Sequence, residues 1–217
     1  MIEEASPLAE EEREKFLTRI AGEQIPPPFS DLVAGLDVQR HKVDDHNSGA
    51  CRKLLKAFDP EVVVLGGTRI ILPHILTLPR RGTVNAHPGL LPWLRGSSSV
   101  AWALYKDLPV GSTIHYVDRG IDTGAIIARR RLPIHWGMTY ERIVRQTLTL
   151  SGDLMAETLA RFEAGDVKGE PQDVTAGETL RVIPPELLKA AKEKLSSGSY
   201  SHFVDDEERH ESNTFST

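Results

Sequence analysis

The chain is poor in cysteine and lacks long apolar runs, and both absences restrict what the protein can be. Cys51 is the only cysteine among 217 residues, which excludes a disulfide within the chain and fits a reducing compartment. No apolar run approaches the roughly 20 residues that a membrane-spanning helix needs, and residues 1–4 are unlike the start of a signal peptide. We therefore expect a cytoplasmic protein with no membrane partner.

Acidic residues gather at the two ends of the chain. Residues 1–15 hold six acids and two bases, and residues 196–217 hold five acids and one base. The two ends together carry −8, against −5 for the whole chain, which leaves the body at +3. This slight positive balance is too weak for a nucleic-acid-binding surface. The hydrophobic share of 40% and the charged share of 26% are ordinary for a globular protein with one main domain.

Helix and strand patterns alternate along the first half of the chain. The predicted elements are a surface helix over 7–21, a short helix over 29–34 and a weak strand around Val38. Asn47 is predicted to cap a helix whose apolar stripe includes Cys51, so we interpret Cys51 as a core residue. The apolar run 62–65, which ends at Gly66-Gly67, predicts a central parallel strand covered on both faces.

The alternation continues through the second half. The predicted elements are strands over 83–87, 112–117 and 125–131, and helices from Ser97 or Ser98 to Tyr105, over 139–163 and over 184–195. The basic run 129–131 is interpreted as a solvated sheet edge. Such alternation predicts an α/β fold with a doubly wound, mostly parallel sheet. The predicted division is an acidic helical segment over 1–28, the α/β domain over 29–183, a C-terminal helix over 184–195 and a disordered acidic tail over 196–217.

Side chains suited to catalysis gather at the ends of two predicted strands. Asn85 and His87 are two residues apart, so they share one face of the strand that stops at Pro88. His115 lies on the second strand, and Asp122 follows it in a loop. In parallel-sheet folds ligands bind beyond the carboxyl ends of strands, where Gly66-Gly67 and the Asn85–His87 tip lie.

Several ordered motifs in this region resemble those of a known family. They read Asn85-x-His87-Pro88-x-Leu90-Leu91-Pro92, Arg95-Gly96, Gly111-x-Thr113-x-His115 and Asp122-x-Gly124. In this order and spacing they resemble the folate-dependent formyltransferase family, whose members include phosphoribosylglycinamide, methionyl-tRNA and sugar-amine N-formyltransferases. The resemblance covers roughly residues 32–173. Gly89 stands where serine is more usual, at a position outside the implied catalytic residues.

The resemblance implies a catalytic trio of Asn85, His87 and Asp122, with 10-formyltetrahydrofolate as the formyl donor. The folate-binding residues that it implies are Gly67, Thr68, Ile70, Leu90, Leu91, Arg119, Gly120 and Gly124. His115 is a possible support, because a structural hydrogen bond to the loop fits its position as well as a role in catalysis does. No metal is expected, since no pair among these residues has the short spacing of a zinc motif.

The residue types suit formyl transfer, in which an amine attacks a formyl carbon. The Asn85 amide can donate to the developing oxyanion, His87 can donate as an imidazolium and relay the proton, and Asp122 favours the charged imidazole. An isolated Asn-x-His would more simply be a turn cap and a core histidine. The downstream motifs favour catalysis.

The expected function is transfer of a formyl group to a primary amine of a small substrate, such as an amino-sugar nucleotide. The alternatives are a phosphoribosylglycinamide formyltransferase, a formyltetrahydrofolate hydrolase and a truncated, non-catalytic folate-binding protein. The chain is expected to lack the leading βαβ portion of the family and the β-barrel of methionyl-tRNA formyltransferase. No nucleic-acid partner is expected, and a homodimer is possible.

Overall fold

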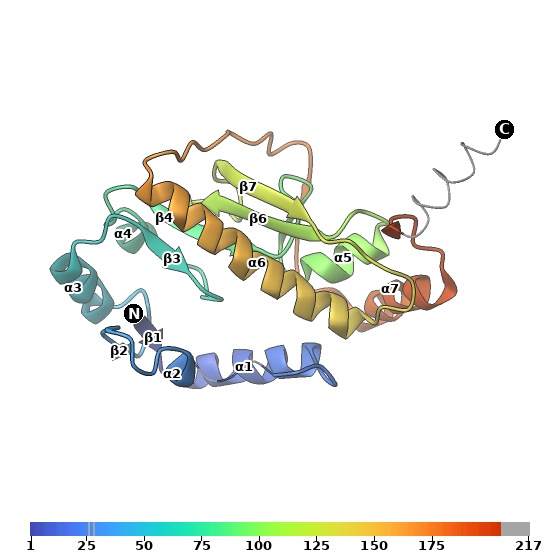
Figure 1. Cartoon of the computed structure of the whole chain (residues 1–217), viewed down its shortest axis with the longest axis horizontal. Coiled ribbons are helices and arrows are strands. Elements are labelled where there is room, and N and C mark those ends of the chain that lie inside the picture. The colour runs from blue at the N-terminus through green and yellow to red at the C-terminus, as the bar shows by residue number, and fades with distance from the viewer. Residues whose placement is uncertain (26, 28, 205–217) are drawn as a thin grey trace. The chain divides into compact units, whose positions relative to one another are not determined.

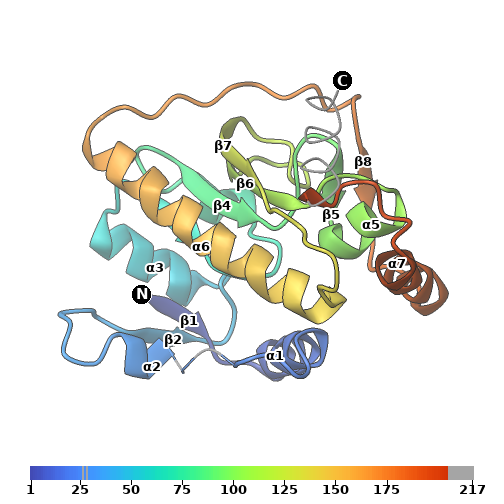
Figure 2. The same cartoon turned by 45° about the vertical axis from the view of Figure 1, so that its right-hand side comes forward.

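A computed structural model describes residues 1–25, 27 and 29–204 of the chain. Two compact units divide it, Met1–Thr83 and Val84–Thr217. This boundary differs from the predicted segments 1–28, 29–183, 184–195 and 196–217, whose division stays a prediction. Figures 1 and 2 give the order of the elements in each unit.

The first unit begins with a short strand that the sequence did not predict. β1 (Ile2–Glu4) pairs in parallel with β2 (His41–Val43), and α1 (Pro7–Arg19) and α2 (Phe29–Leu32) lie between them in the chain. The first strand predicted from the sequence was the weak one around Val38, so β1 is an additional strand that precedes it. Both acids of this strand are paired, since Glu3 contacts Arg40 at 2.8 Å and Glu4 contacts Arg69 at 2.6 Å. The strand predicted around Val38 lies at β2 instead.

The helix α3 (Gly49–Phe58) is capped by Ser48 and not by Asn47 as predicted. The Ser48 hydroxyl accepts a hydrogen bond from the Cys51 backbone. The Asn47 side chain is engaged elsewhere, since it donates to the Ile70 carbonyl and accepts from the Leu72 backbone N–H. Cys51 is buried, and burial raises the pKa of its thiol, as expected for a core cysteine and not a nucleophile.

The end of the first unit differs from the predicted buried strand. β3 (Val63–Leu65) has only three residues, and the Val64 side chain is 41% exposed. The expectation of a strand covered on both faces is therefore wrong. A short helix, α4 (Pro73–Leu76), follows and buries Ile75. The Thr83 hydroxyl donates to the Leu76 carbonyl and holds this helix beside the next strand.

In the second unit, an antiparallel sheet carries most of the predicted site residues. Its strands are β4 (Thr83–His87), β6 (Gly111–Tyr116) and β7 (Ile126–Arg131), in the order β4-β6-β7. β6 is buried along most of its length, and the long helix α6 (Tyr140–Glu163) lies against it (Figure 2). The buried hydroxyls of Ser112 and Ser151 hydrogen-bond at 2.8 Å and join strand to helix.

A second pair of strands in this unit is parallel. β5 (Leu94–Gly96) pairs with β8 (Glu178–Leu180), and both lie near the helices α5 (Ser99–Tyr105) and α7 (Pro185–Ser197). Ser98 is the N-cap residue of α5, one of the two predicted positions. Its hydroxyl accepts from the Ile183 backbone N–H and makes no capping bond.

The chain stays ordered beyond α7, where disorder was predicted from residue 196. Tyr200 is 1% exposed and Phe203 is 2% exposed, because the segment is hydrogen-bonded to the turn after α5. Ser201 donates twice to the Asp107 carboxylate. The expectation of disorder is wrong for residues 196–204, and the rest of the predicted tail lies outside the described residues.

The predicted α/β class is confirmed, with parallel pairing in β1–β2 and β5–β8. The three strands β4, β6 and β7 pair antiparallel, so the sheet that carries the site departs from parallel order. The expected basic edge is found on β7, where Arg129, Arg130 and Arg131 are exposed. Within the described residues, none of the helices combines the length and the apolar character required to cross a bilayer.

Candidate active site

The register between β4 and β6 brings the first polar side chains together. Asn85 pairs with His115, and His87 pairs with Thr113. Residues directly opposite each other on antiparallel strands have side chains on the same face. The Asn85 amide nitrogen accordingly lies 3.3 Å from Nε2 of His115. An amide and an imidazole predicted from separate motifs therefore form one site.

His87 is buried, at 3% exposure, and both of its ring nitrogens have partners. Nε2 lies 2.8 Å from the Leu94 carbonyl oxygen, and Nδ1 lies 3.3 Å from Oδ2 of Asp122. A carbonyl oxygen can only accept a hydrogen bond. Nε2 is therefore protonated and donates a hydrogen bond to the Leu94 oxygen. Nδ1 is then the nitrogen that can exchange a proton with the carboxylate.

Asp122 lies in the loop between β6 and β7, and its side chain is 16% exposed. Its Oδ2 accepts a hydrogen bond of 2.7 Å from the Gly96 backbone N–H, and its Oδ1 lies 3.5 Å from Nε2 of His115. The backbone has a positive φ of 54°, a left-handed conformation that aspartate tolerates better than most residues. The Gln172 amide donates to the Asp122 carbonyl at 3.0 Å and holds this conformation.

The pKa values of this pair are both below their ordinary values. Burial raises the pKa of Asp122, but the contact with His115, the electrostatic interaction with His87 and the Gly96 N–H outweigh burial and lower that pKa. Burial also lowers the pKa of His87, and the Asp122 carboxylate and Leu94 carbonyl offset only part of that effect. Each group contributes to the shift of the other, so the imidazole and the carboxyl titrate as a pair.

His115 is a part of the same cluster. Its Nδ1 lies 2.8 Å from the Tyr116 carbonyl oxygen, to which it donates, so Nε2 faces Asn85 and Asp122. It is 1% exposed and lies behind the two more accessible groups. This geometry agrees with the supporting role considered for His115, and that role stays a prediction.

The predicted binding residues are distributed over both units. Leu90 and Leu91 lie beside the site with buried side chains, and the Leu91 backbone N–H donates to the Thr113 hydroxyl. Those that belong to the loop around Asp122 are Arg119, Gly120 and Gly124. Those that lie in the first unit, after β3, are Gly67, Thr68 and Ile70. The binding roles of all eight stay predictions.

Gly124 has a structural reason to be glycine. A Cβ atom at this position would lie 1.9 Å from the Tyr116 carbonyl oxygen, so any other residue would push the loop away from the end of β6. The loop that carries Asp122 can therefore pass close to the strand that carries His115.

Three residues that hold the trio were not predicted to do so. Leu94 binds the imidazole, Gly96 binds the carboxylate, and Gln172 holds the loop. The Arg95-Gly96 motif was a signal in the sequence, but nothing in it indicated a backbone contact to Asp122. Gln172 lies in an irregular segment without periodicity and gave no signal.

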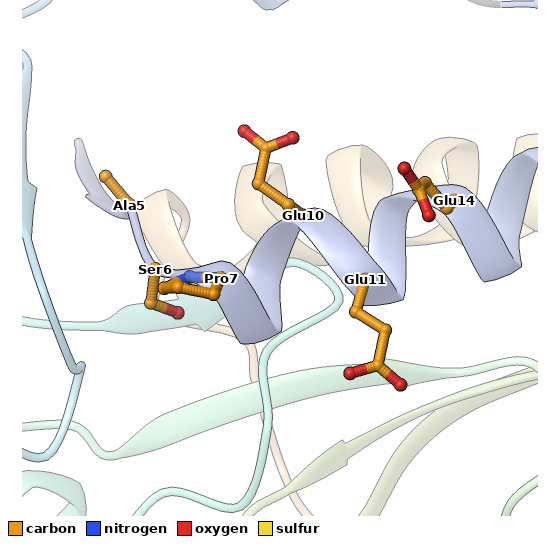
Figure 3. A pocket seen from close by; sticks show the side chains of 6 residues that line it. All are labelled: Ala5, Ser6, Pro7, Glu10, Glu11 and Glu14. Atoms are coloured by element: carbon orange, nitrogen blue, oxygen red, sulfur yellow. The ribbon is translucent and has the colours of Figure 1, made fainter.

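The first unit contains a hollow on α1. It has a volume of about 590 Å³ and is lined by residues of the first unit, which are Ala5, Ser6, Pro7, Glu10, Glu11 and Glu14. In Figure 3 the carboxylates of Glu10 and Glu11 point to different sides of α1 and do not converge. Among the described residues no group of three metal-binding side chains is arranged to hold an ion.

The cluster of Asn85, His87, His115 and Asp122 has the chemistry of an acid–base site for group transfer. A neutral amide and a partly exposed carboxylate lie together at its surface, and two buried imidazoles lie behind them. The amide can bind an oxyanion, and the carboxylate–imidazole pair can hold a proton.

Comparison with known proteins agrees with this class. The family model described as formyl transferase matches residues 19–159, which include all three residues of the trio. The chain therefore belongs to the formyl transferase family. A methionyl-tRNA formyltransferase from Janthinobacterium sp. strain Marseille is 37% identical over 135 residues, covering 61% of this chain and 43% of that protein. This chain spans about half the length of the curated relatives it matches.

Solved structures share the fold. The formyltransferase PseJ from Anoxybacillus kamchatkensis, in complex with UDP-4,6-dideoxy-4-formamido-L-AltNAc and tetrahydrofolate, superposes with a TM-score of 0.60 at 23% identity. The superposition covers 84% of this chain and 93% of that one. Glycinamide ribonucleotide transformylase 1 from Symbiobacterium toebii gives a TM-score of 0.57 at 25% identity, covering 64% and 74% of the two chains.

Proposed function

We propose that the protein transfers a formyl group from 10-formyltetrahydrofolate to a primary amine of a small substrate. The observation that supports this most is the contact of Asp122 with both imidazoles beside the Asn85 amide, within a chain of the formyl transferase family. The proposed acceptor is an amino-sugar nucleotide or a similar compound.

Asn85 is the proposed oxyanion-binding residue. Its amide nitrogen has two N–H groups, and one of them is directed to Nε2 of His115. The second remains for the oxygen of a formyl group that becomes tetrahedral. The hydrogen bond to His115 fixes the plane of the amide, so the donor needs little reorganisation when charge develops.

Asp122 is the proposed group that takes the proton from the attacking amine. It is more exposed than His87, whose nitrogens are both occupied within the protein. A proton that arrives on Oδ2 faces Nδ1 of His87 at 3.3 Å, so the pair can share it. His87 in this proposal shares the proton behind the carboxylate and does not donate directly to the substrate. When the bond between the formyl carbon and N10 of the donor breaks, Asp122 returns the proton to N10, and tetrahydrofolate leaves.

The formyl donor is proposed as a co-substrate that binds beside Leu90 and Leu91 and the loop of Arg119, Gly120 and Gly124. The Leu90 and Leu91 side chains are 3% and 0% exposed, so they would form the floor of such a site. Backbone groups of the loop would supply polar contacts. Gly67, Thr68 and Ile70, in the first unit, are proposed to offer backbone groups for folate binding.

The structural neighbours and the sequence relatives point to different formyl acceptors. Structures with the same fold include a formyltransferase with a formamido-sugar nucleotide, whereas the sequence relatives are methionyl-tRNA formyltransferases. The body charge of +3 suits a small polyanion such as a sugar nucleotide or a folate polyglutamate, and is weak for tRNA. We therefore propose no nucleic-acid partner.

The test follows the fate of the formyl group. The protein is mixed with 10-formyltetrahydrofolate alone, and then with an amino-sugar nucleotide, glycinamide ribonucleotide or methionyl-tRNA. A transferase needs a bound amine to reach a useful effective molarity, so tetrahydrofolate should appear only with an acceptor and together with formylated product.

The other outcomes identify the alternatives. Release of formate from the donor alone would establish a hydrolase, in which water replaces the amine at the same trio. Formylation of glycinamide ribonucleotide or methionyl-tRNA in preference to the amino sugar would keep the chemistry and overturn the acceptor. Folate binding without any turnover would leave a non-catalytic binding protein.

A further inference from the structure

The strand β5 contacts both members of the His87–Asp122 pair. The Leu94 carbonyl accepts from Nε2 of His87 at 2.8 Å, and the Gly96 N–H donates to Oδ2 of Asp122 at 2.7 Å. Residues two apart on a strand direct their backbone groups to the same side. One side of β5 is therefore hydrogen-bonded to the imidazole through Leu94 and to the carboxylate through Gly96.

The opposite side of β5 is bonded to β8. The Trp93 carbonyl accepts from the Glu178 N–H at 3.0 Å, and the Ser97 N–H donates to the Leu180 carbonyl at 2.9 Å. Gly96 also lies against this strand, since a Cβ atom there would be 2.2 Å from the Leu180 oxygen. The position of β8 thus limits where Gly96 can direct its N–H group.

Arg95 lies between Leu94 and Gly96, and its side chain is buried, at 6% exposure. The guanidinium donates to the carbonyls of Pro92 and Gly177, each at 2.9 Å, and to the Thr179 hydroxyl at 3.2 Å. No carboxylate forms an ion pair with it within the described residues.

A buried charge without a counter-charge destabilises a protein unless hydrogen bonds satisfy it. The acceptors of Arg95 lie on both sides of it, Pro92 ahead of β5 and two residues on the β8 segment (residues 177–180). A rigid, planar guanidinium can satisfy such divergent acceptors together, and lysine cannot match that geometry. The arrangement clamps the β8 segment to β5.

We propose that Arg95 is a positioning residue, which clamps β5 to the β8 segment and so fixes the contact of Gly96 with Asp122 and of Leu94 with His87. This inference rests on the proposed formyl transfer for its effect on activity. Its structural part concerns only the contacts just described. Arg95 acts through β5 and touches neither substrate nor the reacting atoms.

The central test replaces Arg95 with methionine, which keeps the length and apolar stem and removes the donors. Turnover should fall about tenfold, because displacement of catalytic groups by a fraction of an ångström costs one to two orders of magnitude, while the KM for the formyl donor changes little. Arg95→Lys should restore part of the turnover. Arg131→Met, at an exposed arginine of β7, is the matched control and should be unaffected.

Two measurements on the protein without substrate separate positioning from a general loss of stability. The groups that surround the Asp122 carboxyl are His87, His115 and the Gly96 N–H. When the Gly96 bond weakens, the pKa of Asp122 should rise toward its ordinary value, as followed by carbon NMR of its carboxyl group. Amide hydrogens of residues 178–180 should exchange faster with deuterium than in the wild type.

A milder variant keeps the test decisive if Arg95→Met does not fold. Thr179→Val removes one acceptor of Arg95 and should shift the Asp122 titration and the amide exchange in the same direction by a smaller amount. The proposal is overturned if turnover falls while both of these stay at wild-type values, or if none of the three changes. If the wild type transfers no formyl group to any amine, the proposed function fails, and the two substrate-free measurements still decide the role of Arg95.

Discussion

Asn85 differs from the other residues of the trio in the kind of contact that it makes. Its amide is held by one hydrogen bond to His115 and is more exposed than either imidazole. Asp122 and His87, by contrast, form a charge-coupled pair whose properties depend on burial. Substitutions at these positions should accordingly affect different observables.

Replacement of Asn85 by alanine should lower turnover on the order of 10²–10³-fold, because one oxyanion donor is lost. Binding of tetrahydrofolate, measured by calorimetry, should be largely kept, since the fold and the rest of the site remain. Asn85→Gln, which keeps the amide but moves it along a longer side chain, is the matched control and should recover little. Wild-type turnover in Asn85→Ala would remove Asn85 from the mechanism.

The stability of the protein should depend on pH through His87. Its pKa in the folded protein is lowered from the ordinary 6.5, so the unfolded chain takes up the proton first as the pH falls. The contribution of this group to the free energy of unfolding is complete above about pH 6.5 and is lost as the pH falls toward the lowered folded pKa. Urea unfolding between pH 8 and pH 5 measures it.

The control for this pH dependence is His87→Gln, which keeps a polar side chain without a proton equilibrium. It should be less stable than the wild type at pH 8 and should lose less stability on acidification to pH 5. An equal loss in the two proteins would show that other groups, and not His87, determine the acid sensitivity.

The helices and strands that were predicted well are those whose ends are determined by residues close to them in the sequence. β4 follows from a β-branched start and a stop at Pro88. The helix predicted over 139–163 is α6, and the structure shows that Thr139 is its N-cap. β5 and β8 were missed because each has three residues and the contacts that hold them join distant positions. Arg95 and Thr179, for example, are 84 residues apart.

The residues of the candidate site also fall into those that the sequence predicted and those that it did not. Asn85, His87 and Asp122 could be found from motif and strand alternation, because the chemistry depends on their residue types. The groups that position them are backbone atoms of Leu94 and Gly96, which any residue carries and which no residue type reveals. The helix is capped by Ser48 and not by Asn47 for a similar reason. The Asn47 side chain is hydrogen-bonded to the backbone of Ile70 and Leu72, which are distant in the sequence.

Replacement of Gly96 by alanine should separate β5 from β8. The added Cβ would lie 2.2 Å from the Leu180 oxygen, and the φ of 90° disfavours any side chain. Gly137→Ala is the matched control, because its φ of 82° carries the same backbone penalty with no atom within 4 Å. The difference in melting temperature between the two variants measures the clash, and a difference of zero would contradict the close approach.

The start of α6 gives a test of local stability. The Thr139 hydroxyl accepts from the Arg142 N–H, so Thr139→Ala should cost about 1 kcal/mol and lower the melting temperature by about 2–4 °C. Thr139→Ser keeps the acceptor and should melt close to the wild type. Equal melting of the alanine and serine variants would mean that the cap contributes nothing.

For the molecule as a whole, the last described residues return to the body of the second unit. Asp107 has a left-handed φ of 57° and accepts both hydrogen bonds from Ser201. Tyr200 donates to the Leu108 carbonyl, and Val204 donates to the Ile134 carbonyl. Tyr200 and Phe203 are buried in this docked segment.

Replacement of Asp107 by alanine should release this segment, because the two acceptors for Ser201 are lost and the left-handed backbone is disfavoured. Limited proteolysis should then cut after residue 198 sooner than in the wild type. Asp107→Asn tolerates the same backbone and keeps one acceptor oxygen, so it should be cut at an intermediate rate. Equal rates in all three proteins would contradict docking through Asp107.

The pairing of β5 with β8 also has a consequence for the synthesis of the protein. Synthesis proceeds from the N-terminus, so a nascent chain that has reached Asp122 already carries Asn85, His87 and Asp122. The strand that pairs with β5, which contacts His87 and Asp122, has not yet been synthesised, since β8 spans Glu178–Leu180. By this reasoning, polypeptides released between these two points would contain all the chemistry and remain inactive.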